Sequence, residues 1–153
     1  MKNLSASDSV SMKIKLISDR LAEEGLRMEI DIMPPMEFLH KHGFHKGNIP
    51  MVRVTALIDT GAKTCAIDRS VVAELGVIPY KSTAVKTPLF TMETEVYQLI
   101  YKIPGKDEYF PVVAVAADLS ADDCKALIGR DFLQYCRLTY DGANESGTLE
   151  ILK

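Results

Sequence analysis

The sequence lacks several features that would mark particular classes of protein. Its formal net charge is −3 and its pI is about 5.6, so it has no excess of basic residues to bind phosphate backbones. Nucleic acid is therefore not an expected partner. No apolar run approaches the roughly 18 residues that a membrane span requires, and we expect no association with a membrane.

Cysteine is also scarce. Cys65, Cys124 and Cys136 are an odd number of residues at unrelated spacings, with no CxxC pair. A disulfide framework or a zinc site would need paired cysteines, so the sequence predicts free thiols in a reducing compartment. The N-terminal residues lack the apolar segment of a signal peptide. Together these absences predict a cytoplasmic protein.

The composition, 47% hydrophobic and 25% charged over 153 residues, is that of an ordinary globular domain with its own core. Residues 1–11 are polar and serine-rich, and we expect a flexible tail there. Residues 12–153 are expected to form a single domain. Within it, residues 12–50 are an N-terminal extension whose role stays open between dimer interface, removable pro-segment and outer packing.

Apolar residues alternate with polar ones over most of the chain, which predicts strands. The stretch 19–25 is either a hairpin connection or one helical turn. Short helices are expected after Pro34-Pro35, over 69–75 between a capping Asp68 and Gly76, and from about 130. The chain is therefore mainly β, with strands predicted at 12–16, 26–32, 52–58, two within 83–103, 109–117, 126–128, 137–140 and 148–152.

One carboxylate stands at the end of a predicted buried strand. The apolar run 52–58 leads directly into Asp59-Thr60-Gly61-Ala62. A buried carboxylate is costly unless it is hydrogen-bonded or used in chemistry. The threonine hydroxyl can bridge to nearby backbone, and the glycine lets the chain turn closely. Although the tripeptide alone could be a simple turn, a second apolar pair ending in glycine follows later in the chain, at Leu127-Ile128-Gly129.

At these two motifs the sequence resembles the retropepsin-like aspartic proteases, the family of retroviral proteases and their bacterial relatives. The resemblance covers Val52 to about Leu152. It implies a closed β-barrel-like acid protease fold with two or three short helices and one lobe per chain. It also implies a catalytic loop and a supporting strand and helix: catalytic Asp59, loop residues Thr60, Gly61 and Ala62, and the supporting segment Ile128, Gly129, Arg130 and Asp131.

The same resemblance implies a β-hairpin flap over the substrate at about residues 84–101, and two details differ from the viral pattern. The tip region 87–92 has no glycine. Lys63 stands where viral enzymes often have an aspartate that binds substrate backbone and pairs with the arginine of the second motif. Asp131 and Asp68 are the candidates to replace that partner of Arg130. The expected substrate-binding residues are Lys63, Thr87, Pro88, Leu89 and Phe90.

The chain contains a single Asp-Thr-Gly, whereas this chemistry needs two carboxylates. The resemblance therefore implies a homodimer that hydrolyses peptide bonds between two copies of Asp59, without metal or organic cofactor, and with a bell-shaped, acid-leaning pH profile. Strand 148–152 is the expected interface strand. The alternative is a non-catalytic dimerisation or peptide-binding module, which the glycine-free flap and Lys63 favour.

Two further groups of residues have a functional and a structural interpretation. His40, His42 and His45 could suggest a metal site, but positions two apart on a helix do not face each other, and solvated surface histidines are expected. Cys65 could suggest a nucleophile, but no histidine partner is evident, and a small buried residue is expected.

Overall fold

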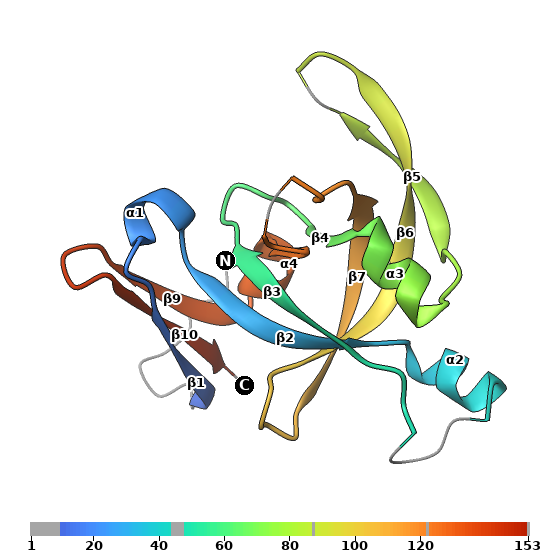
Figure 1. The fold of residues 1–153 in the computed structure, drawn as a ribbon, viewed down its shortest axis with the longest axis horizontal. Helices are drawn as coiled ribbons and strands as arrows, with labels where there is room; N and C mark the ends of the chain where they lie inside the picture. Colours follow the sequence, from blue (N-terminus) through green and yellow to red (C-terminus); the bar gives the residue numbers. More distant parts are fainter. Residues whose placement is uncertain (1–9, 44–47, 87, 122, 153) are drawn as a thin grey trace.

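The computed structural model describes residues 10–43, 48–86, 88–121 and 123–152, and within them the fold is mainly β, as predicted (Figure 1). The helices in these ranges are short: α1 (Leu21–Glu24), α2 (Met36–Lys41), α3 (Arg69–Leu75) and α4 (Arg130–Leu133). The strands form two sheets: β1 (Val10–Ile17), β2 (Arg27–Met33), β3 (Val52–Ile58), β4 (Cys65–Asp68), β5 (Lys81–Lys86), β6 (Thr91–Lys102), β7 (Tyr109–Ala117), β8 (Ala126–Ile128), β9 (Cys136–Asp141) and β10 (Ser146–Leu152).

The larger sheet has the order β2-β3-β8-β4-β7-β6-β5, and β2 pairs again with β6, so the sheet closes on itself like a barrel. Its pairs are mostly antiparallel, but β8 lies parallel to β3 and β4 lies parallel to β7. Because β8 runs parallel to its neighbour β3, the segments that follow these two strands emerge at the same edge. This arrangement brings together the two motifs that the sequence analysis singled out.

The closure between β2, β3 and β6 contains a buried ion pair. Asp31 is 1% exposed and accepts two hydrogen bonds from Arg53 on the neighbouring strand, at 2.7 and 3.1 Å. Its other neighbour in the register is Lys102 of β6. A buried carboxylate is tolerated only when it is paired and hydrogen-bonded. The half-exposed Arg53 provides both the opposite charge and the two hydrogen bonds.

The smaller sheet has the order β1-β10-β9 and is antiparallel throughout. Its central strand is β10, which is paired along both edges. The prediction that strand 148–152 pairs across a dimer interface is therefore wrong in this fold, because the edges of this sheet belong to β1 and β9. Strand β1 also begins two residues before the expected strand start at Met12, since Val10 already pairs with Leu152.

Local signals in the sequence place the helices. The Asp68 side chain accepts a hydrogen bond from Ser70 N at 3.1 Å, and Gly76 follows Leu75 in the left-handed conformation, with φ of 70°. Helix α3 therefore has the predicted bounds. The undecided stretch 19–25 forms one helical turn, α1, closed by Gly25. Helix α2 begins after Pro35 as predicted.

Candidate active site

The Asp59 loop begins where β3 leaves the sheet. Asp59 N donates to Ile128 O at 3.0 Å, and Ala62 N donates to Asp59 O at 3.2 Å, which closes a tight turn. Asp59 is half-buried, while Thr60 and Gly61 are exposed. The carboxylate thus lies at the molecular surface, on a turn anchored by the neighbouring strand.

The Asp59 carboxylate is oriented by the loop itself. Gly61 N donates to Asp59 Oδ1 at 2.9 Å. A Cβ atom at Gly61 would lie 3.2 Å from the same oxygen, closer than most side chains tolerate. Among the described residues, no hydrogen bond reaches the second carboxylate oxygen. The arrangement therefore holds the acid in one direction and leaves one oxygen available for a substrate or a second acid.

The second motif supports this loop from behind through backbone hydrogen bonds. Arg130 N donates to Ala62 O at 2.9 Å, and Asp131 N donates to Lys63 O at 3.1 Å. A Cβ atom at Gly129 would lie 2.5 Å from the backbone carbon and oxygen of Thr64, so only glycine allows the two segments to approach this closely. The structure thus brings the two motifs together as the sequence analysis expected.

Arg130 does not pair with either predicted carboxylate. Its Nη1 atom donates to Thr60 O at 2.8 Å, so the guanidinium holds the loop by a carbonyl. Asp68 caps α3 and accepts from Leu119 N at 2.7 Å. Asp131 turns toward Cys65, whose backbone amide lies 3.1 Å from both carboxylate oxygens. The predicted replacement by Asp131 or Asp68 is therefore wrong.

Cys65 belongs to a buried polar cluster behind the loop, which sequence reasoning missed. Its Sγ atom lies 3.2 Å from Asp131 Oδ1 and 3.5 Å from Gly129 N. Burial raises the pKa of the Cys65 thiol to about 12, which is unfavourable for a nucleophile. The Tyr101 hydroxyl is also buried and has no hydrogen-bond partner among the described residues, and burial raises its pKa well above the usual value. No sequence spacing links these residues.

The Cys65 thiol predicts a loss of stability in alkaline solution. Its pKa rises from 9.0, the ordinary value expected for the unfolded chain, to about 12 in the folded protein. Between these values the unfolded chain loses the proton while the folded chain keeps it, so stability falls as pH increases, by up to about 1.4 kcal/mol per pH unit. Urea denaturation at several pH values above 8 measures this. Cys65→Ser keeps a donor for Asp131 but does not titrate there, so its stability should fall less steeply; equal slopes would contradict the assignment.

The β5–β6 hairpin occupies the place where the flap was expected. In Figure 1 it rises well clear of the body, on the same upper side of the view as the loop between β3 and β4. Pro88, Leu89 and Phe90 lie in its connection, and Leu89 is 90% exposed. Thr87 is outside the described residues. Among the described residues, no hydrogen bond joins Pro88, Leu89 or Phe90 to Asp59.

The histidine-rich segment begins within α2, which contains His40, and His42 follows the end of the helix. His42 Nδ1 lies 3.0 Å from Phe38 O, and its ring stacks on Phe38 at 4.1 Å between centroids. His45 is outside the described residues. Over the described ranges, no three His, Cys, Asp or Glu side chains gather where they could hold a metal ion. In the same part of the chain, no helix has the length and apolarity to cross a membrane.

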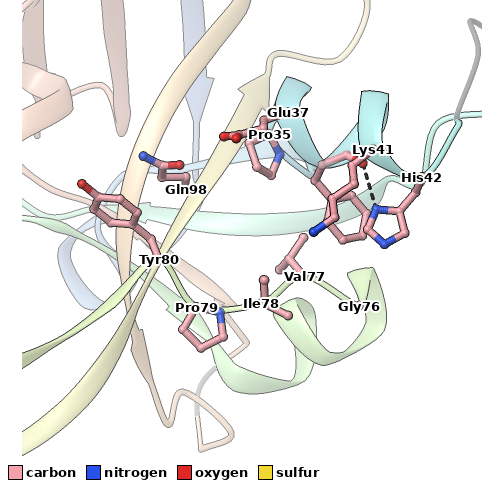
Figure 2. Close-up of a pocket in the computed structure, with 11 residues that line it drawn as sticks. Pro35, Glu37, Lys41, His42, Gly76, Val77, Ile78, Pro79, Tyr80 and Gln98 are labelled. Carbon is pink, nitrogen blue, oxygen red and sulfur yellow. Dashed lines mark hydrogen bonds between the residues drawn. The ribbon is translucent and has the colours of Figure 1, made fainter.

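A cavity of about 500 Å³ lies away from the Asp59 loop, between α2 and the segment 76–80 (Figure 2). Glu37 and Lys41 line it from α2, and Tyr80 and Gln98 lie at its other end. None of its lining residues belongs to the predicted site. Because the two segments are far apart in the sequence, only the fold brings them together, and no motif would have indicated the cavity.

A search of the sequence against protein-family models and curated proteins finds no match. Solved structures do match. A retropepsin-like aspartic protease from Rickettsia conorii superposes with a TM-score of 0.59 at 17% identity, over 97% of this chain and 98% of the other. The simian foamy virus (mac) protease superposes with a TM-score of 0.46 at 16% identity, over 71% and 92% of the two chains.

Proposed function

We propose that this chain, which has a retropepsin-like fold, is one half of a homodimeric aspartic endopeptidase with Asp59 as its catalytic carboxylate. The observation that carries the proposal is the position of Asp59. It lies at the surface on a tight turn, with Oδ1 held by Gly61 N and with a supporting segment behind it. A carboxylate fixed in this way without an ion pair among the described residues is suited to chemistry more than to stability.

The reaction follows from two such carboxylates meeting at a two-fold axis. Two acids at hydrogen-bonding distance share one proton, so one is ionised and one is protonated. The ionised acid removes a proton from a water molecule, whose oxygen attacks the scissile carbonyl carbon, while the protonated acid donates to the carbonyl oxygen. In the collapse of the tetrahedral intermediate, the acid that took the proton from water gives it to the leaving nitrogen, the other acid takes back a proton from a hydroxyl group, and the C–N bond breaks. The products are a carboxylic acid and an amine.

Two features of the described residues support pairing with a second copy. Thr60, Gly61 and Thr64 of the loop are exposed, so the surface beside Asp59 faces solvent. The apolar tip of the β5–β6 hairpin is also exposed, with Leu89 90% exposed. A second copy would cover both surfaces and supply the second acid. The edge strands β1 and β9 of the smaller sheet are the candidates for contact between the copies.

The test is cleavage of a complex peptide mixture by purified protein, with and without a statine-type mimic of the tetrahedral intermediate. The proposal expects cleavage that the mimic inhibits and that falls more than proportionally on dilution, because dilution separates the two copies. Sedimentation over the same concentrations should show a dimer–monomer transition. Binding of peptides without any cleavage would favour the non-catalytic module instead.

A further inference from the structure

The charges around Asp59 indicate a class of substrate. Residues Asp59 to Ala62 form one tight turn, which the hydrogen bond from Ala62 N to Asp59 O closes. The ends of such a turn lie within about 7 Å between Cα atoms, so the Cα atom of Lys63 lies within roughly 11 Å of that of Asp59. A lysine ammonium on its four-carbon stem reaches much of that distance.

Lys63 and Arg130 are the cations of this surface, and both are exposed. Neither forms an ion pair with a carboxylate among the described residues. Arg130 donates to the carbonyl oxygen of Thr60, the residue after Asp59, so its charge is fixed beside the loop. A guanidinium has five N–H groups, and the others remain available for a carboxylate.

Two acids beside the loop point away from the outer surface, and the exposed acid Glu93 lies further along β6, opposite Ala84. Asp131 is half-buried, and its oxygens accept from Cys65 N, Cys65 Sγ and Phe132 N, so they point into the protein. Asp68 is buried and caps α3. On the β5–β6 hairpin, the charged residue nearest the tip is another exposed cation, Lys86, which pairs with Thr91.

We infer that the Asp59 site selects peptides that carry a glutamate or aspartate near the scissile bond, with Lys63 as the residue that determines this preference. The inference rests on the proposed function, and it names the substrate class of the same site. A peptide in an extended conformation advances about 3.3 Å per residue. Its side chains two or three positions from the scissile bond therefore pass within reach of Lys63, and Arg130 adds to the attraction for the same charge.

The experiment starts from a peptide that the protein cleaves in the mixture. Glutamate, glutamine or lysine is placed in turn at each of the flanking positions, and kcat/KM is measured at about pH 6, where glutamate is ionised. At one or more positions, glutamate should be preferred over glutamine by roughly three- to tenfold, and lysine should be the poorest. The preference should weaken between about 0.05 M and 0.5 M salt, because exposed charges are screened.

Three variants assign the preference to its residue. Lys63→Gln should lose the preference for glutamate, so that the ratio of kcat/KM for the glutamate peptide to kcat/KM for the glutamine peptide, both measured with this variant, falls to about one. Lys63→Glu should favour the lysine peptide. Lys106→Glu makes the same charge change on the exposed turn between β6 and β7, away from the site, and should keep the wild-type preference. Sedimentation checks that each variant keeps the oligomeric state of the wild type.

The outcomes separate the two proposals. Cleavage with no difference between the glutamate, glutamine and lysine peptides would overturn the inference about the substrate but would leave the proposed protease function supported. A glutamate preference that Lys63→Gln and Lys63→Glu both retain would also overturn it. If the wild type cleaves no peptide at all, the proposed function fails.

Discussion

Asp59→Asn should abolish peptide cleavage while the protein remains folded. The asparagine amide has nearly the shape of the carboxylate and can still accept from Gly61 N, the contact that Asp59 Oδ1 makes at 2.9 Å. It cannot take a proton from water or share one with a second acid. We expect kcat/KM to fall by on the order of 10³-fold or more. Peptide cleavage followed by mass spectrometry measures the loss.

A matched variant makes this result specific. Asp107→Asn makes the same change in an exposed aspartate in the turn between β6 and β7, which has no part in the site. It should retain wild-type cleavage. Thermal denaturation and sedimentation of both variants should match those of the wild type. Wild-type cleavage by Asp59→Asn would refute the proposed mechanism, and binding of peptides by the wild type without any cleavage would support the non-catalytic module.

Gly129→Ala should cost more stability than any other single methyl group added at this site. The new Cβ atom would lie 2.5 Å from the backbone carbon and oxygen of Thr64 and 3.0 Å from Cys65 N. Backbone atoms cannot rotate away as a side chain can, so the two motifs must separate. Overpacking of this kind costs about 1–3 kcal/mol, which for a chain of this size lowers Tm by roughly 2–12 °C.

Gly142→Ala is the control for that substitution. Its Cβ atom would meet the Tyr140 ring at 3.3 Å, and this ring is exposed and can move. Its Tm should stay close to that of the wild type. Cleavage should also decrease in Gly129→Ala below its Tm, because the loop that holds Asp59 moves with Thr64. An unchanged Tm in Gly129→Ala would show that the close contact with Thr64 does not exist in solution.

Much of the fold could be predicted because its signals are local. The alternation of apolar residues defines most strands, and Asp68 and Gly76 define α3 within a few residues of sequence. The loop and its supporting segment could also be paired, since both carry motifs of one fold. The resemblance to retropepsin-like proteases is confirmed at the level of the fold.

The parts that could not be predicted depend on contacts between distant residues. The prediction gave Arg130 a carboxylate partner, but its guanidinium donates to a backbone carbonyl oxygen of the adjacent loop. Every residue has such a carbonyl, so the sequence does not indicate which one accepts the hydrogen bond. Asp131 satisfies the amide of Cys65, so it was not available to Arg130. The residues of β10 alternate as in any strand, and this alternation does not indicate that β10 lies between β1 and β9 in the sheet.

The smaller sheet also constrains how the protein is made. Strand β1 comes near the start of the chain and its partner β10 comes last, and Ser11 Oγ donates to Ile151 O at 3.1 Å. Contacts between residues so far apart in sequence close large loops, which slows folding. During synthesis β1 must wait until β10, which is far downstream in the sequence, has left the ribosome. Until then its edge is exposed, and the nascent chain is vulnerable to pairing with other strands.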